Sequence, residues 1–224
     1  ATTTGATNTG VGYSSLGSNT TASFNSAFGY GALTATTTGQ YNVAVGNAAL
    51  DANTTGEFNI GIGFNALGTE DTGSRNVAIG HEALATQNSD TTNYNTAVGH
   101  HAGKLITTGV ENNLIGALAG DALTSGSYNV AVGHAALSAA TSSQGNSAVG
   151  YNALAVATVG NYNVAMGYGA MIANVNGDRS VGIGVSALAT QAPASANTDM
   201  YNTAVGYEAG KSVTTGIQNT FIGG

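Results

Sequence analysis

The residue types that carry most protein chemistry are scarce in this chain. Its 224 residues include four His, eleven Asp and Glu, four Lys and Arg, and no Cys. Without cysteine there is no thiolate nucleophile, no disulfide and no cysteine-based metal site. The acidic residues are scattered, and the adjacent carboxylates Glu70 and Asp71 are expected to be solvated on a turn. Because acid–base and nucleophilic catalysis need such groups held together, the sequence predicts a protein that is not an enzyme and binds no cofactor.

The histidines raise one metal hypothesis. His81 and His100 fall at the same point of two successive sequence repeats, with His101 beside them, so imidazoles could share a metal ion there. The alternative is that histidine merely replaces tyrosine in a stacking column, as at His134. This alternative is favoured because no acidic or cysteine partner recurs nearby, and no metal site is predicted. The nonapeptide of calcium-binding β-rolls is not found either.

All ten tyrosines fall at two points of the repeat. A first aromatic column directly precedes the repeat's asparagine and contains Tyr41, Tyr94, Tyr128, Tyr162 and Tyr201. A second aromatic column directly follows the repeat's glycine; its Tyr and His members are Tyr13, Tyr30, His81, His100, His134, Tyr151, Tyr168 and Tyr207. Aromatic faces pack on the apolar faces of sugars, so the second column is a candidate ladder of glycan contacts. Mutual stacking, which contributes about 0.5–1.5 kcal/mol per pair, is the favoured alternative because the rings recur throughout the chain.

A repeat positions all of these residues. The pattern Asn-x-Ala-Val/Ile-Gly recurs every 17 residues, with two longer spacings, of 19 residues after Asn76 and 22 residues after Ser180. Stacked asparagines hydrogen-bond along an axis, and glycines mark tight bends or positive φ. The predicted structural ladder therefore contains Asn25, Asn42, Asn59, Asn76, Asn95, Asn129, Asn146, Asn163 and Asn202, together with Gly29, Gly46, Gly63, Gly80 and Gly99.

The repeat predicts an all-β fold. A 17-residue unit is too short for a helix–turn–helix repeat, and its first residues are small, β-branched and closed by glycine. We therefore expect a parallel β-solenoid, or β-roll, of about 13 coils forming a single array over residues 1–224. The large apolar residue at the third position after asparagine is expected to fill the coil, beside a leucine column (Leu33, Leu50, Leu67, Leu84, Leu137, Leu154 and Leu188). The alanine at the second position would face outward and allow close approach of another layer.

The sequence also contains a longer repeat, which spans several coils. Residues 75–116 match residues 179–223, which gives a six-coil super-repeat and indicates a fragment of a longer fibre. Both copies carry an insertion directly after Ala-Thr-Gln, at 87–93 and at 191–199. Segments that break the period project outward, so these are the candidate specific binding loops; the alternative is a tolerated loop expansion.

Charge and hydropathy exclude two classes of partner. The net charge is −7 with four scattered basic residues, so no nucleic-acid binding is predicted. No apolar run approaches the length of a membrane span, so no membrane insertion by this segment is predicted.

The repeat units resemble those of a known family. Asn-Ser-Ala-Val-Gly at 146–150 and Asn-Val-Ala-Ile-Gly at 76–80 resemble the head repeats of YadA-type trimeric autotransporter adhesins. The variant at 202–216, Asn-Thr-Ala-Val-Gly-Tyr through Ala-Gly-Lys to Thr-Thr-Gly, also resembles repetitive shafts of phage tail fibres. The resemblance covers essentially the whole chain, although the adhesin repeat is typically shorter. It implies a parallel β-roll in each of three subunits, intertwined or side by side in a homotrimer.

Pattern and resemblance together predict a function. We expect a rigid spacer in a trimeric surface attachment fibre, outside the cell on a virion tail fibre or a bacterial surface. Its partners would be its own copies and, through weak multivalent contacts, a host surface polysaccharide or glycoprotein. Two alternatives stay open: a self-assembling extracellular filament, and a monomeric ice-binding solenoid. The second is disfavoured because the threonines are adjacent in turns, as at Thr37 and Thr38, instead of alternating along a strand.

Overall fold

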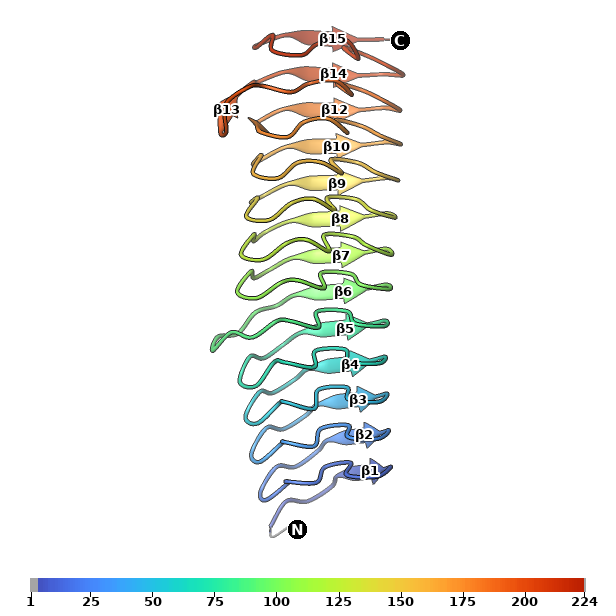
Figure 1. Ribbon diagram of the computed structural model, residues 1–224, viewed down its shortest axis with the longest axis vertical. Helices are drawn as coiled ribbons and strands as arrows, with labels where there is room; N and C mark the ends of the chain where they lie inside the picture. The colour runs from blue at the N-terminus through green and yellow to red at the C-terminus, as the bar shows by residue number, and fades with distance from the viewer. Residues whose placement is uncertain (1–3, 224) are drawn as a thin grey trace. The chain divides into compact units, whose positions relative to one another are not determined.

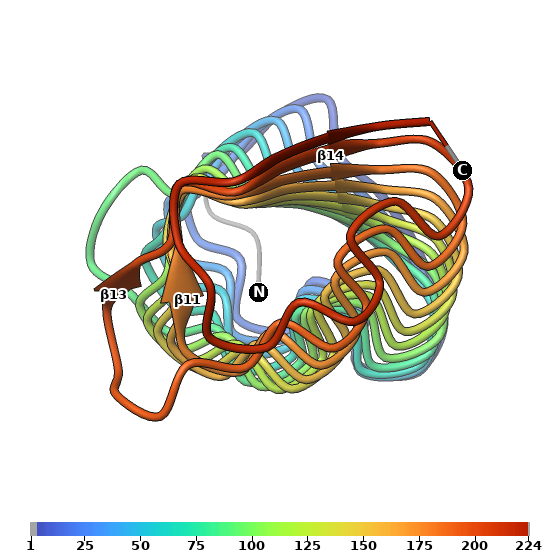
Figure 2. The same ribbon diagram turned by 90° about the horizontal axis from the view of Figure 1, so that it is seen from above.

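The computed structural model describes residues 4–223, and the chain divides into two compact units, Ala1–Glu111 (unit 1) and Asn112–Gly224 (unit 2). Within each unit the chain winds through stacked coils whose strands point in one direction (Figure 1). Seen from above, the strand forms one side of each coil and the turns return along the other side (Figure 2). Each unit is described by itself below.

Unit 1 holds six three-residue strands among its described residues. They are β1 (Thr9–Val11), β2 (Ser26–Phe28), β3 (Val43–Val45), β4 (Ile60–Ile62), β5 (Val77–Ile79) and β6 (Thr96–Val98). Neighbouring strands pair in parallel with the repeats in register, so that Ala27 pairs with Ala44 and Ala44 with Gly61. The longer connection before β6 leaves the register intact, because Val77 still pairs with Thr96.

Unit 2 continues the pattern with seven such strands and one additional pair. The seven are β7 (Asn113–Ile115), β8 (Val130–Val132), β9 (Ser147–Val149), β10 (Val164–Met166), β12 (Val181–Ile183), β14 (Thr203–Val205) and β15 (Thr220–Ile222). The additional pair is β11 (Gly177–Asp178) with β13 (Thr198–Asp199), also parallel. No helix occurs in residues 4–223. The predicted all-β parallel β-solenoid of about 13 coils, with a 17-residue repeat, is confirmed.

The interior of the coils overturns one expectation. Second-position residues such as Ala27 and Ala44 are fully buried, whereas the third-position residues Phe28 and Val45 are 41% and 38% exposed. The prediction that the third position fills the coil while alanine faces outward is therefore wrong. The alanine faces the interior of the coil, and the large apolar residue faces outward.

The narrow cross-section of the coil explains the exchange. The predicted leucine column is fully buried, and it reaches across the coil to the second position. A Cβ atom added to Gly61 would lie 3.1 Å from Leu50 Cγ. With leucine opposite, only alanine or glycine fits on the inner face of the strand, and the larger residue must point outward.

Two exceptions to the alanine pattern support this account. Leu114 occupies the second position in unit 2, and in the same coil the leucine column carries Gly120, whose added Cβ would lie 2.9 Å from a Leu114 methyl. Phe221 also occupies a second position, and an added Cβ on Gly210 would lie 2.8 Å from its ring. The interior volume is conserved by exchanging a large and a small residue across the coil.

Two geometric features, a positive φ and close contact with the next coil, select glycine at the positions of the glycine column. Gly29, Gly46, Gly63, Gly80 and Gly99 have φ between 134° and 142°, a region that side chains rarely allow. A Cβ atom on Gly63 would also lie 2.6 Å from the carbonyl carbon of Gly80. Left-handed backbone extends beyond glycine, however, because Leu33 and Tyr41 have φ of 52° and 59°. The hydrogen bonds between coils hold these residues in a conformation that costs roughly 1–2 kcal/mol each.

The asparagine column is buried and hydrogen-bonded between coils. Asn42 Nδ2 donates to the carbonyl oxygen of Gly56 at 2.8 Å, and its Oδ1 accepts the backbone N–H of Asn59 at 2.9 Å. The same two kinds of bond recur at Asn25, Asn59, Asn129, Asn146, Asn163 and Asn202. Asn76 and Asn95 extend the column, with Asn95 donating to Gly109 and to Gln87. Each side chain thus satisfies backbone groups that solvent does not reach.

The acidic pair at 70–71 is not the solvated turn expected from the sequence. Glu70 is fully buried, because its register points into the coil. Its Oε2 accepts from Gln87 Nε2 at 2.8 Å and from Asn93 Nδ2 at 3.0 Å. Its Oε1 accepts the Gly73 N–H at 2.7 Å. The carboxylate is stabilised by amide donors inside unit 1.

Candidate binding surface

The second aromatic column lines the outside of the turn that follows each strand. Tyr13 and Tyr30 stack with ring centroids 5.4 Å apart, and Tyr151 stacks on Tyr168 at 5.1 Å. His134 stacks on Tyr151 at 5.3 Å. The tyrosine rings remain open to solvent at their outer edges, as shown by Tyr30 and Tyr168, which are both 60% exposed, and by Tyr207, which is 63% exposed. The column therefore offers ring edges more than free ring faces.

The first aromatic column also stacks, and it includes arginines. Tyr41 lies between Phe24 and Phe58, at 4.9 and 5.0 Å with interplanar angles of 3°. The Arg75 guanidinium carbon then lies 5.2 Å from the Phe58 ring centroid and 5.8 Å from that of Tyr94. Such cation–π contacts contribute about 0.5–1 kcal/mol at exposed sites.

Three of the four histidines gather in unit 1. His81 and His100 stack at 5.3 Å, and the His101 ring lies 3.7 Å from that of His100. One nitrogen from each ring lies within 4.8 Å of the other two. His101 Nε2 is 3.0 Å from Glu82 Oε2, and Lys104 Nζ is 2.6 Å from the same oxygen. Burial, followed by the charge of Lys104, lowers the pKa of His101 below its ordinary value.

Both insertions extend outside the coils of their own unit (Figure 2), yet both keep some side chains in the interior. In the first insertion Thr91 is exposed, while Asn93 is buried against Glu70. After the second insertion Met200 is fully buried. Pairing of β11 with β13 and an ion pair between Arg179 and Asp199 fix the second insertion to its coils.

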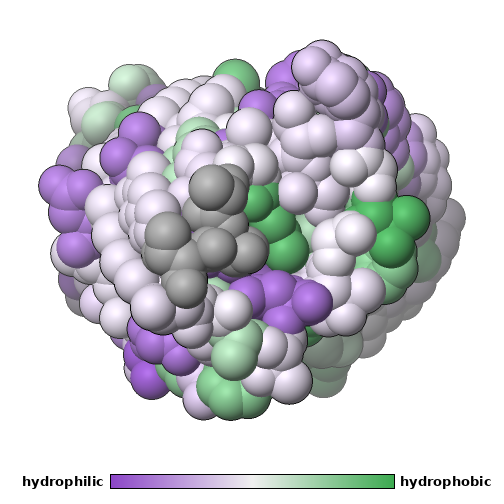
Figure 3. All heavy atoms as spheres, turned by 90° about the horizontal axis from the view of Figure 1, so that it is seen from below, coloured by the Kyte–Doolittle hydropathy of each residue, from purple (hydrophilic) through white to green (hydrophobic). Residues whose placement is uncertain are grey.

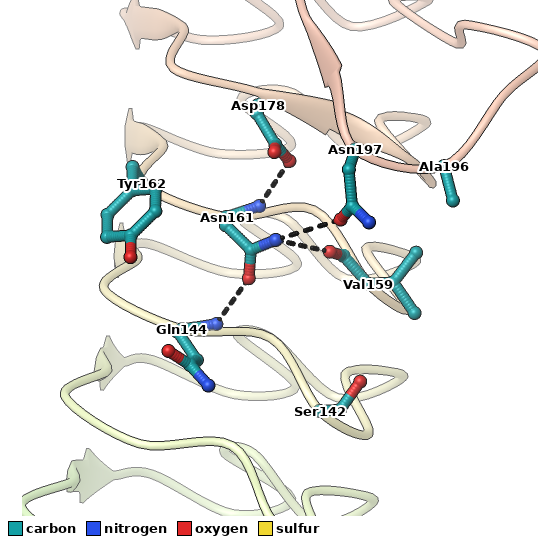
Figure 4. A pocket seen from close by; sticks show the side chains of 8 residues that line it. All are labelled: Ser142, Gln144, Val159, Asn161, Tyr162, Asp178, Ala196 and Asn197. Atoms are coloured by element: carbon teal, nitrogen blue, oxygen red, sulfur yellow. Dashed lines mark hydrogen bonds between the residues drawn. The ribbon is translucent and has the colours of Figure 1, made fainter.

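A hollow of about 480 Å³ lies between the second insertion and the coils beside it in unit 2. Its polar lining comes from Asn161, Asn197, Gln144, Asp178 and Ser142, and Tyr162 stands at its edge, with Val159 and Ala196 completing the wall (Figure 4). Tyr162 is 54% exposed, and the Arg179 guanidinium carbon lies 5.5 Å from its ring centroid. A half-exposed aromatic ring beside amide and carboxylate groups is one of the combinations that bind sugars.

Hydrogen bonds hold the floor of the hollow in place. Asn161 Oδ1 accepts the Gln144 N–H at 2.8 Å, and the Asn161 N–H donates to Asp178 Oδ1 at 2.7 Å. Asn161 Nδ2 donates to Asn197 Oδ1 at 3.1 Å, which connects the coil to the insertion. These bonds leave the Asn197 amide nitrogen pointing away from Asn161 as a group for a ligand, while the Tyr162 hydroxyl, on the other side of Asn161, points toward the coil of Gln144 (Figure 4).

The outward face of the strands is uncharged and carries an apolar residue at the third position of every repeat. These residues are half-buried or exposed, for example 44% exposed at Ile115 and 47% at Met166, and the first position beside them alternates between apolar residues such as Val43 and polar ones such as Ser147. None of the thirteen three-residue strands contains a charged residue. Seen from below, the surface shows small hydrophobic patches among strongly and weakly polar residues (Figure 3). Exposed apolar residues gathered on one face are typical of interaction sites.

Sequence reasoning placed the aromatic columns and the insertions, but it missed the hollow. Gln144 and Asn197 look unremarkable in the sequence, and only folding brings them beside Asn161 and Tyr162. The signal that pointed in this direction was the interruption of the period at 191–199. Within the described residues there is no helix long and apolar enough to cross a membrane. No protein-family model, curated protein or solved structure matches the chain.

Proposed function

We propose that this chain is a rigid structural segment of a trimeric surface attachment fibre, a phage tail fibre or a bacterial adhesin, that works outside the cell. The observation that supports this most strongly is the outward apolar column at the third position, which recurs on strand after strand without a charge. A monomer would leave that column in water. Three copies packed through this face would bury it about a shared axis.

The resemblance of the repeat to adhesin heads and tail-fibre shafts supports the same assembly. The exchange of the two strand faces also favours it, because the large side chains, and not the alanines, are available for packing between copies. Burial of apolar surface contributes roughly 25 cal/mol per Å², so a column repeated in every coil gives an interface whose stability grows with fibre length.

The first test is the absolute mass in solution by size-exclusion chromatography with light scattering, at two concentrations. We expect a species of three times 21.9 kDa at both concentrations. A monomer at both would contradict the trimer and leave the ice-binding solenoid, which an ice-growth assay checks. Mass that grows with concentration would indicate the self-assembling filament.

A matched pair of variants locates the interface. Val45 on the outward face and Val156 on a turn are 38% and 40% exposed. In Val45→Glu, each trimer would bury three carboxylates near its axis, so we expect the trimer to dissociate to monomer at concentrations where the wild type stays trimeric. Val156→Glu is expected to leave the mass unchanged. Equal behaviour of the two variants would place the interface elsewhere.

We further propose that the hollow beside the second insertion is the specific glycan contact of this fibre. The second aromatic column would add weaker contacts along each copy, and multivalency would raise their combined avidity. This proposal rests on the exposed Tyr162 ring and the outward amide of Asn197.

An array of immobilised oligosaccharides tests the glycan proposal. We expect Tyr162→Ala to weaken binding about 3- to 10-fold, the effect of losing one aromatic contact. Tyr128→Ala is the control: it has the same register and is 56% exposed against 54% for Tyr162, but it lies outside the hollow. Equal losses would mean that contacts are spread along the column, and binding to no oligosaccharide would contradict a glycan partner.

A further inference from the structure

The four histidines of this chain are unevenly distributed. Three of them, His81, His100 and His101, belong to two successive coils of unit 1. The super-repeat offers an internal comparison, because the corresponding residues of the second copy are Val185, Tyr207 and Glu208. The following lysine pairs with a glutamate in both copies, but the glutamates differ: Lys211 pairs with Glu208, which stands where His101 does, and Lys104 pairs with Glu82 of the preceding coil. The imidazoles are therefore an addition to the repeat at this one place.

We propose that His81, His100 and His101 form a binding site for a divalent transition-metal ion of the zinc type, which connects two neighbouring coils. Neutral imidazole is a preferred ligand of Zn²⁺, Ni²⁺ and Cu²⁺. Zinc binds histidine nitrogen at about 2.0–2.1 Å, so tetrahedral ligation needs nitrogens about 3.4 Å apart. The three nitrogens lie within 4.8 Å of one another on side chains at the surface, so small rotations of the rings bring them to that spacing.

Glu82 orients one of the ligands. His101 Nε2 lies 3.0 Å from Glu82 Oε2, so a proton on Nε2 would face this carboxylate and leave Nδ1 for the metal. A carboxylate behind a metal-bound histidine fixes the tautomer and the ring orientation.

Charges of both signs lie beside the site. The ammonium group of Lys104 lies 2.6 Å from Glu82 Oε2, so the carboxylate offsets part of its repulsion of a metal cation. The Phe64 ring stacks on His81 at 5.2 Å and limits its movement to one side. Backbone pairing holds His81 and His100 in register, since the His101 N–H donates to the His81 carbonyl oxygen at 2.9 Å. Three ligands from two paired coils leave a further position for water or a partner's group.

Titration of the metal-stripped full chain with Zn²⁺, followed by calorimetry, tests the proposal. We expect saturation at one ion per chain, with His100→Gln and His81→Gln each lowering the affinity at least about 100-fold. His134→Gln, which alters a histidine of the same column elsewhere in the chain, is expected to change nothing. Glu82→Gln is expected to lower affinity about 10-fold, the usual effect of removing an orienting carboxylate.

A second measurement separates the site from adventitious binding. Co²⁺ in place of Zn²⁺ is expected to give visible absorption bands typical of low coordination number, and these are lost in His101→Gln. Circular dichroism checks that each variant keeps the wild-type fold, which the exposed positions of His81 and His100 favour. Lack of saturation, or saturation unaffected by His100→Gln, would overturn the site. So would a stoichiometry below one ion per chain, because it would place the metal between copies.

Discussion

Replacing Gly167 with alanine is expected to lower the free energy of unfolding by about 3–5 kcal/mol. The glycine follows β10 with φ of 135°, and an added Cβ would lie 2.6 Å from the carbonyl carbon of Gly184 in the next coil. Backbone strain and steric overlap each cost roughly 1–3 kcal/mol, and here they act together. Because the overlapping atom belongs to the backbone of a paired coil, no side-chain movement relieves it.

Gly169, two residues further, is the control for this variant. Its φ is 59°, and the nearest atom to an added Cβ would be Ser186 Oγ at 4.0 Å. Other coils carry Ala48 and Ala135 at the same register, with φ of 54° and 53°. Gly169→Ala should therefore cost about 1 kcal/mol, the backbone strain alone. Denaturant midpoints and hydrogen exchange at β10 and β12 measure both variants, and losses of equal size would show that contact between coils is not what selects glycine at Gly167.

The fold could be predicted from the sequence because a parallel solenoid places equal registers above one another. The period predicts which residues are neighbours, so the asparagine, leucine and aromatic columns follow from spacing alone. Tyr41 lies between Phe24 and Phe58 simply because all three directly precede the repeat's asparagine. In a solenoid the contacts between neighbouring coils are as regular as the contacts within a coil.

The sequence did not predict the faces of the strand. Three-residue strands such as Val43–Val45 carry an apolar residue on both sides of a small one, so their alternation fits either orientation. The outcome depends on the width of the coil, which is set by the leucine opposite: with Leu50 inside, the interior accepts only Ala44 or Gly61. The spacing of residues in the sequence does not give the width of the coil.

The polar interior and the hollow were missed for a related reason. Glu70 points into the coil because of its register, but Asn93, one of the donors to its carboxylate, comes from the insertion of the neighbouring coil, and the path of an insertion is not periodic. The hollow beside Tyr162 likewise depends on where Asn197 comes to rest. The repeat does not predict where the side chains of the insertions lie, because the insertions depart from its spacing.

Replacing a residue of the asparagine column is the second change expected to lower the free energy of unfolding strongly. In Asn146→Ala, the Asn163 N–H loses the Oδ1 acceptor at 2.8 Å, and the Gly160 carbonyl loses the Nδ2 donor at 2.8 Å. Both groups are inside the coil, where leaving a polar group unpaired costs roughly 1–3 kcal/mol. We expect a loss of about 3–4 kcal/mol in the free energy of unfolding. Asn152→Ala in the same coil is the control, since Ala135 already occupies that register; a comparable loss there would mean that asparagine acts through the turn and not through the column.

The one coil that lacks this asparagine shows what the column requires. Ser180 stands in its place, and Gln191 fills the gap: its Nε2 donates to Ser180 Oγ at 3.1 Å, while its Oε1 accepts Asn202 Nδ2 at 2.8 Å. In the coil of Asn146 the register of Gln191 holds Ala157, which is buried and apolar. Asn146→Ser alone should therefore be nearly as harmful as Asn146→Ala. Adding Ala157→Gln should recover about 1–2 kcal/mol, a coupling that a double-mutant cycle measures directly and that independent sites would not show.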